Sequence, residues 1–134
     1  MQFSTTSDYA IRTVLFLALH RERCCTAGEI GAAMGIPAMY LNKITKRLKS
    51  AGILRTIQGN GGGYLLMKNP AEISLYDILS LTEQSVEING CLEDERFCSR
   101  HAAETCPVRK IYAGINTRMK DSLSEATIQS LLDG

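Results

Sequence analysis

Residues 26–67 read TAGEIGAAMGIPAMYLNKITKRLKSAGILRTIQGNGGGYLLM, and this stretch decides the fold. Thr26, followed three residues later by Glu29, has the form of a capping box, which opens a short helix that Gly35 ends. A second helix follows almost at once over residues 37–51, with apolar residues at helical spacing on one face and polar and basic residues on another. The pattern is typical of two helices joined by a tight glycine turn.

The residues behind this helix pair predict a β-hairpin. Residues 53–58 read as a strand, the run Gly59 to Gly63 forms a tight connection, and residues 64–67 return as a second strand. A phosphate-binding loop is not expected at the glycine run, because the Lys-Ser/Thr ending of a P-loop is absent and a strand follows it. The hairpin is therefore expected to form the wing of a winged helix-turn-helix.

Helices are also predicted on both sides of this module. Residues 7–21 form an apolar helix that is expected to be buried on two faces, and Ser74 caps another helix after the break at Asn69-Pro70. Pro107 suits the first turn of a long helix. That helix carries an apolar stripe at helical spacing, and a short final helix follows; the stripe is Val108, Ile111, Tyr112, Ile115 and Met119.

Length and composition bound the class of protein. The 134 residues suit one domain with an appended arm, and 45% hydrophobic with 22% charged residues is ordinary for a globular protein. The sequence shows neither a signal-peptide pattern nor a run of about 18 apolar residues, so a cytoplasmic protein with no membrane contact is expected. Five cysteines in a reducing compartment are more often metal ligands or redox thiols than structural disulfides.

The charge is unevenly distributed, although the net charge is only +1. No Asp or Glu occurs from Gly31 to Ala71, and that interval contains Lys43, Lys46, Arg47, Lys49, Arg55 and Lys68. A solvated lysine face is the alternative for the charges alone. Together with the helix-turn-helix spacing and the wing, however, they predict DNA binding, with the second helix in a major groove and the hairpin along a phosphate backbone.

Three cysteines, Cys91, Cys98 and Cys106, lie close together in one polar segment that lacks hydrophobic periodicity. Thiolates are the soft ligands that iron–sulfur clusters and zinc require, and an irregular loop can direct several of them to one point. Neither interval is the two-residue interval of a zinc knuckle, although Cys98 and His101 would satisfy a short Cys–His step. Inert thiols and a reversible disulfide sensor are the alternatives. An enzyme is not expected, because neither histidine has a neighbouring catalytic partner.

The chain resembles the Rrf2 family of winged-helix regulators, whose members include IscR-, NsrR-, RirA- and CymR-like proteins. The resemblance covers nearly the whole chain and is carried by residues 7–12 (SDYAIR), 35–41 (GIPAMYL) and 59–65 (GNGGGYL) and by the three cysteines before the long helix. It implies a mainly α fold with a small β-hairpin, made of a winged helix-turn-helix and a long C-terminal dimerisation helix. It also implies a homodimer on a pseudo-palindromic double-stranded operator, with a 4Fe-4S or 2Fe-2S cluster on the three cysteines.

The resemblance also bears on the fourth cluster ligand. IscR-like members use a histidine at the position of Arg109 as a ligand, so this chain departs from their pattern and their ligation is not favoured here. NsrR-like members use an aspartate from the partner subunit at the position of Asp8, with an arginine at the position of Arg12. Asp8 and Arg12 stand at i and i+4, where an arginine can keep a carboxylate ionised and oriented. Asp8 is therefore the favoured ligand, His101 is the second candidate, and a plain surface ion pair is the alternative.

The family's DNA-contacting positions map onto the second helix and the wing. An uncharged Gln58 stands where IscR-like members have an arginine, so the operator need not resemble theirs. The expected contacts are Pro37, Met39, Tyr40, Asn42, Lys43, Lys46, Arg47, Gln58, Gly59, Asn60, Gly61 and Gly62.

The expected organisation is a DNA-binding domain over residues 1–84, a cluster loop over 85–106 and a dimerisation region over 107–134. The implied function is a transcriptional repressor or activator that senses redox, nitric oxide or iron–sulfur status. The alternative is a cluster-free regulator that uses thiol redox or protein partners, as CymR-like members do.

Overall fold

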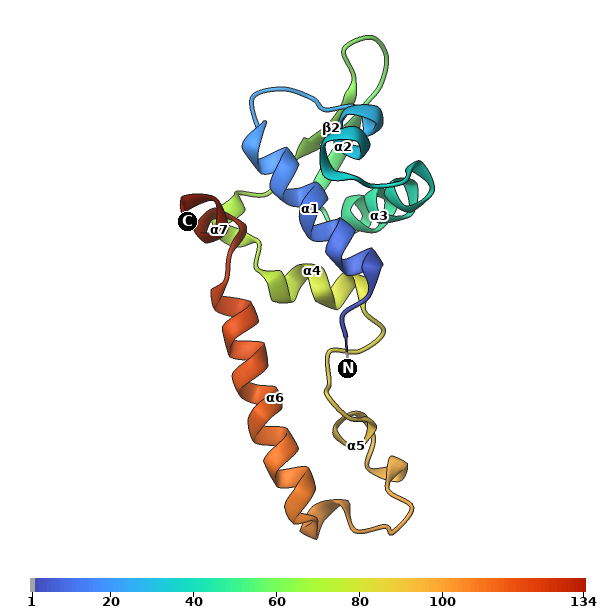
Figure 1. Cartoon of the computed structure of the whole chain (residues 1–134), viewed down its shortest axis with the longest axis vertical. Helices are drawn as coiled ribbons and strands as arrows, with labels where there is room; N and C mark the ends of the chain where they lie inside the picture. The colour runs from blue at the N-terminus through green and yellow to red at the C-terminus, as the bar shows by residue number, and fades with distance from the viewer. Residues whose placement is uncertain (1) are drawn as a thin grey trace.

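A computed structural model of the chain describes residues 2–134, and it shows a head of packed helices with one hairpin and an arm that extends from it (Figure 1). The wing and the cysteine-bearing segment lie at opposite ends of the molecule. In chain order the elements are α1 (Thr5–Leu19), α2 (Ala27–Met34), α3 (Ala38–Ser50), β1 (Leu54–Ile57), β2 (Gly63–Leu66), η1 (Pro70–Glu72), α4 (Leu75–Thr82), α5 (Gly90–Glu93), η2 (Glu95–Phe97), η3 (Ala103–Thr105), α6 (Pro107–Glu125) and α7 (Ile128–Asp133).

The helix ends follow the capping residues, with one correction. Thr26 Oγ accepts the N–H of Glu29 at 3.1 Å, as predicted, and Gly35 ends α2 in the left-handed conformation that glycine adopts without strain. The second hydrogen bond of the predicted capping box, from the Thr26 backbone N–H to the Glu29 carboxylate, is not formed. The Glu29 carboxylate accepts from Arg23 at 2.7 Å instead. A complete capping box is present at the start of α4, between Ser74 and Asp77.

The predicted hairpin is confirmed. Strands β1 and β2 pair antiparallel, with Leu54 opposite Leu66 and Ile57 opposite Gly63. The base of the hairpin is fixed to the segment before α2, since the backbones of Cys25 and Tyr64 exchange two hydrogen bonds. A Cβ at Gly63 would lie 2.5 Å from the Cys25 carbonyl oxygen, so only glycine fits there.

Helix α1 is the scaffold of the head and packs against α2, α3, α4 and α7. It begins at Thr5 and ends at Leu19, two residues earlier at each end than the sequence indicated, and Leu19 itself is exposed. The core is formed by fully buried side chains of α1, of these four helices and of β1, among them Val14, Leu17, Ile30, Leu41, Ile44, Leu48, Leu54, Ile78 and Ile128.

The arm leaves the head after α4 and returns along α6 (Figure 1). The segment that the sequence left irregular contains three short helical turns, α5, η2 and η3. After α6 the chain re-enters the head, where Ile128 N donates to the carbonyl of Ile73 at 2.8 Å. Within residues 2–134, no helix combines the length and the apolar character needed to cross a membrane.

Candidate nucleic-acid interface and cysteine site

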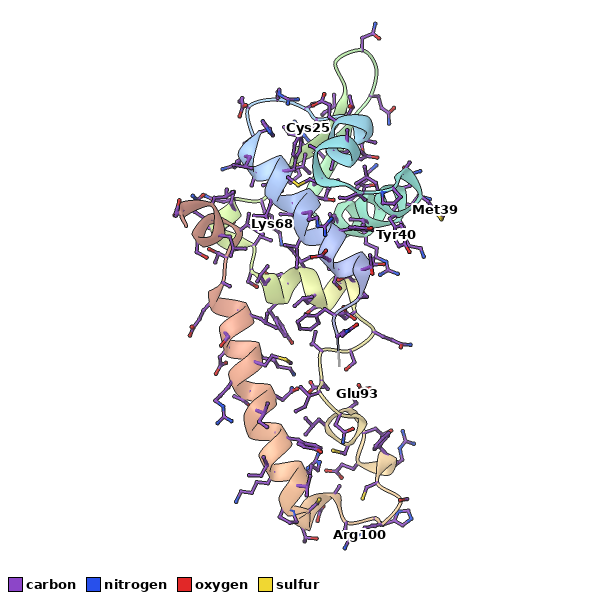
Figure 2. All side chains as sticks on the ribbon, viewed as in Figure 1. Cys25, Met39, Tyr40, Lys68, Glu93 and Arg100 are labelled. Atoms are coloured by element: carbon purple, nitrogen blue, oxygen red, sulfur yellow. The ribbon has the colours of Figure 1, made fainter. Side chains whose placement is uncertain are left out.

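Helix α3 has one face in the core and one face open. Leu41, Ile44 and Leu48 are buried, and this burial fixes which side chains point outward. Met39 is 80% exposed and lies with Tyr40 at the free end of the helix (Figure 2). Pro37, Asn42, Lys43 and Lys46 are exposed as well, so all of these predicted contacts are available to a groove.

Two of the predicted α3 contacts have partners inside the chain. The ring of Tyr40 packs edge-on against Tyr9, with the centroids 5.2 Å apart. Arg47 Nη1 donates to the carbonyl oxygen of Thr82 at 3.4 Å. Tyr40 thus presents only part of its ring to a ligand, and the guanidinium of Arg47 is directed toward the end of α4.

The tip of the wing is exposed at Gln58, Gly59, Asn60 and Gly61, whereas Gly62 is half-buried. The tip turns tightly, because Gly62 N donates to Gly59 O at 3.0 Å. The bare backbone N–H groups of such a tip can approach a phosphate closely. The hairpin also extends beyond the helices of the head (Figure 1).

In the part of the chain that the structure describes, the basic side chains of the interval 31–71, which includes α3 and the wing, have no acidic partners. The ion pairs of residues 2–134 are Asp8–Arg12, Arg23–Glu29, Asp94–Arg96, Glu95–Arg109 and Glu87–Lys120. None of them includes a basic residue from the acid-free interval 31–71. Exposed cations without counter-charges are suited to DNA phosphates, whose neutralisation dominates DNA affinity.

At the other end of the molecule, Cys91, Cys98 and Cys106 line one cavity of about 240 Å³. Cys91 lies in α5, Cys98 directly follows η2, and Cys106 caps α6. The remaining walls come from the loop and the first turns of α6, including Asn89, Phe97, Val108, Arg109 and Tyr112. Three thiols that are far apart in the sequence therefore open onto one space.

Each of the three sulfurs has a hydrogen-bond donor nearby. Asn89 Nδ2 donates to Cys91 Sγ at 3.3 Å, and the Arg109 backbone N–H donates to Cys106 Sγ at 3.4 Å. Backbone N–H groups of Ala102 and Arg100 lower the pKa of Cys98. Donors directed at sulfur stabilise the thiolate, which is the form that binds a metal.

The donor set fits an iron–sulfur cluster in its chemistry, although the ligands are not assembled within one chain. Soft thiolates with hydrogen bonds to sulfur are what such clusters require. Across residues 2–134, however, no group of three or more His, Cys, Asp or Glu side chains is close enough together to hold a metal ion. The cysteine ligation stays a prediction.

The two candidates for the fourth ligand lie in different places. Asp8 is in α1, in the head, and its carboxylate accepts from Arg12 Nη2 at 2.6 Å. His101 is in the arm but lines a neighbouring hollow with Glu95 and Glu104 rather than the cysteine cavity. Helix α1, which bears Asp8, lies in the head, apart from α5 and the cysteine-bearing end of the arm (Figure 1), so ligation by Asp8 requires a second subunit.

Arg109 lines the cysteine cavity and supports it, whereas from the sequence it is notable only for standing where IscR-like members have a histidine. Its Nε donates to the carbonyl of Cys91 at 3.0 Å, while its guanidinium also lies 3.7 Å from Glu95. Arg109 therefore fastens the cysteine loop to the start of α6. In the sequence, only its position three residues after Cys106, in the first turn of the predicted helix, indicates that Arg109 lies near the cysteines.

The comparisons with known proteins agree on the family. The family model described as Rrf2, iron-dependent transcriptional regulator, matches residues 3–134. The chain belongs to the Rrf2 family. Within this family, a putative HTH-type transcriptional regulator of Aquifex aeolicus is 30% identical over 99% of this chain and 92% of its own length. The regulator IscR of Pectobacterium atrosepticum is 29% identical over 99% of this chain and 80% of its own length.

Solved Rrf2 structures share the fold. The structure of CymR, the global cysteine regulator of B. subtilis, has a TM-score of 0.82 at 25% identity and covers 98% of this chain and 95% of its own. The predicted fold class, mainly α with a winged helix-turn-helix, is confirmed. This Rrf2 protein is a transcriptional regulator and not an enzyme.

Proposed function

We propose that this Rrf2 regulator binds a pseudo-palindromic operator as a homodimer and senses redox, nitric oxide or iron–sulfur status through a cluster on Cys91, Cys98 and Cys106. The observation that carries the proposal is the single cavity shared by the three thiols. A bound cluster would supply iron that reacts with oxygen or nitric oxide. The chain's own part is to direct hydrogen-bond donors at the sulfurs, from Asn89 and from backbone N–H groups, and to hold the loop against α6 through Arg109.

A connected set of side chains leads from Asp8 to the helix-turn-helix. Arg12 bonds Asp8 through one guanidinium nitrogen and, through the other, the carbonyl of Met34 at 3.1 Å, at the end of α2. The same guanidinium lies over the ring of Tyr9, which packs on Tyr40 at the start of α3. A change of partners at Asp8 therefore reaches both sides of the helix-turn-helix turn, and hence the fit of α3 to DNA.

The open face of α6 supports the homodimer. Val108, Ile111 and Ile115 are 53%, 63% and 40% exposed and follow one another at spacings of three and four along the helix. A row of exposed branched side chains on a long helix is typical of a protein interface. A second subunit would also bring an Asp8 to the arm, which one chain cannot do.

Iron and acid-labile sulfide per chain after anaerobic purification, with the visible absorbance, test the proposal. Colour with both elements bound is the expected result. A colourless, metal-free protein that still binds its operator would contradict the proposal. It would support the alternative, a cluster-free regulator. The structural similarity to the B. subtilis cysteine regulator CymR is the observation that favours this alternative.

Replacing Asp8 by Ala is expected to shorten the lifetime of the bound cluster in air by about tenfold or more, because an oxygen ligand and the partner of Arg12 are lost. The decay of visible absorbance measures the effect. Asp121→Ala removes an exposed carboxylate from α6 and is the matched control. An Asp8→Ala protein with an unchanged lifetime would exclude Asp8 as a ligand.

Replacing Lys43 by Ala is expected to weaken operator binding and to lower the slope of log affinity against log salt by about 0.9, the value for one lost phosphate contact. The measurement is a salt titration of operator binding by fluorescence anisotropy. Lys110→Ala, an exposed lysine on the arm, should leave the slope unchanged. An equal slope for Lys43→Ala and the wild type would remove Lys43 from the phosphate contacts.

A further inference from the structure

Three helices of the head meet at the C-terminal end of α4. The buried hydroxyl of Ser7 in α1 lies 2.5 Å from Thr82 Oγ1 and 2.7 Å from Glu83 Oε1. The N–H of Ser4 donates to the same Glu83 oxygen at 2.5 Å, and Arg47 of α3 donates to the Thr82 carbonyl. We name these five residues, Ser4, Ser7, Arg47, Thr82 and Glu83, the α4 junction.

Glu83 is the electrostatic centre of the junction. Burial raises the pKa of Glu83, but the donors of Ser7 and Ser4 outweigh burial and lower that pKa overall. A carboxylate only accepts hydrogen bonds, so the Ser7 hydroxyl must donate to it. An ionised Glu83 thus keeps the first turn of α1, which also bears Asp8, in a fixed orientation.

The position of Glu83 is explained by α1 and not by its own helix. A negative charge at the C-terminal end of α4 is unfavourable in the field of that helix, whereas the same charge at the N-terminal end of α1 is favourable. The opposite charge is favourable at the carbonyl groups that end α4, and the Thr82 carbonyl there accepts a hydrogen bond from the guanidinium of Arg47. The junction therefore ties α1 and α3 to one end of α4.

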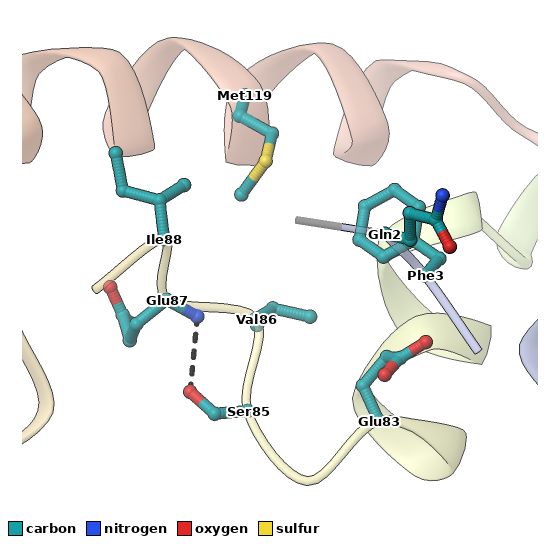
Figure 3. A pocket seen from close by; sticks show the side chains of 8 residues that line it. All are labelled: Gln2, Phe3, Glu83, Ser85, Val86, Glu87, Ile88 and Met119. Carbon is teal, nitrogen blue, oxygen red and sulfur yellow. Dashed lines mark hydrogen bonds between the residues drawn. The ribbon is translucent and has the colours of Figure 1, made fainter. Parts of the chain in front are cut away.

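Glu83 also begins the linker that leads to the cysteine loop. Figure 3 shows this linker passing from Glu83 through Ser85 to Ile88, opposite Met119 of α6. Its far end is fixed, because Ile88 N donates to the buried Asn116 at 2.8 Å and Glu87 is bonded by Asn116 and Lys120. The linker is thus anchored on the arm at one end and on the α4 junction at the other.

We propose that Glu83 is a positioning residue that transmits the position of the cysteine loop to the recognition helix α3 within one chain, through Ser7 and through the neighbouring Thr82–Arg47 contact. This inference rests on the proposed function and adds a path that does not need the partner subunit. A displaced linker moves Glu83, and Glu83 moves the start of α1 and the end of α4 together. In this role Arg47 orients α3, and its guanidinium is not a phosphate contact.

The first test compares operator affinity in the cluster-loaded and cluster-free forms. Glu83→Gln keeps the shape of the side chain and removes its charge, and it should bring the ratio of the two affinities at least about fivefold closer to one, the size of a typical coupling. Glu72→Gln, an exposed carboxylate in η1, is the matched control and should keep the wild-type ratio. An unchanged ratio in Glu83→Gln overturns the proposal.

The second test uses the cluster-free chain, so it stands even if the proposed sensing fails. Hydrogen exchange should accelerate in Glu83→Gln at the first turn of α1, in the linker over residues 84–89 and at the C-terminal half of α3 together. Arg47→Ala should leave the salt slope of DNA binding as in the wild type, in contrast to Lys43→Ala. Faster exchange at α1 alone, or a reduced slope in Arg47→Ala, overturns the proposal.

Discussion

Cys98→Ala is expected to yield a protein that purifies without iron or sulfide, even in the absence of oxygen. Removing Cys98 leaves two thiols in the cavity, and Cys98 is also the thiol whose pKa is lowered by backbone donors. Loss of one of three thiolates removes far more binding free energy than loss of a supporting hydrogen bond, which itself costs about 10- to 100-fold in metal affinity. Iron and sulfide analysis and the visible spectrum measure the result.

Cys24→Ala is the matched control for Cys98→Ala. Cys24 is a half-buried free thiol outside the cavity, so its removal should leave the iron content unchanged. Thermal unfolding of both variants should be close to that of the wild type in the cluster-free form, because Cys98 is not buried in the core. A Cys98→Ala protein that retains its colour and its iron would show that the cavity is not the cluster site.

The sequence was sufficient for the recognition helix and the wing because both are encoded locally. The side-chain periodicity of α3 and the Gly35 turn depend on neighbours along the chain, and so does the glycine run of the hairpin. Residues 26–67 therefore predicted the module nearly to the residue.

Contacts between distant segments could not be read in the same way. Glu29 suits a capping box equally well whether or not Arg23 is near, and only the folded loop before α2 decides which partner it takes. Arg47 has the spacing of an exposed DNA contact, which stays a prediction, and only the fold shows that the Thr82 carbonyl at the end of α4 also lies within its reach. In both cases a long charged side chain has several possible partners, and the sequence alone does not show which of them the fold brings near.

The cysteine site lies between these two cases. The types of ligand were visible in the sequence, whereas their shared cavity depends on three short helical turns that have no hydrophobic periodicity. Asn89 and Arg109, which support the site, are separated from each other by the entire loop. Supporting residues of this kind are recognised from geometry, since their types alone do not distinguish them from surface residues.

Ile111→Glu is expected to convert the proposed homodimer to a monomer and to weaken operator binding by about 100-fold or more. Burying one such side chain contributes about 1.5–3 kcal/mol, and two-fold symmetry makes every substitution act twice in the interface. Two linked recognition helices gain roughly 10²–10⁴ in avidity over one, and a monomer loses that gain. Sedimentation velocity and operator titration measure the two effects.

The exposure of Ile111 makes this variant informative. At 63% exposure in the single chain, Ile111 is not required for the fold of the head, so a normal unfolding temperature is expected for the cluster-free monomer. Thr117→Glu places the same charge on another face of α6 and should remain dimeric. If Ile111→Glu remained a dimer with full operator affinity, the apolar stripe of α6 would be excluded as the interface. The proposed ligation by Asp8 of a second subunit would then require a different dimer interface.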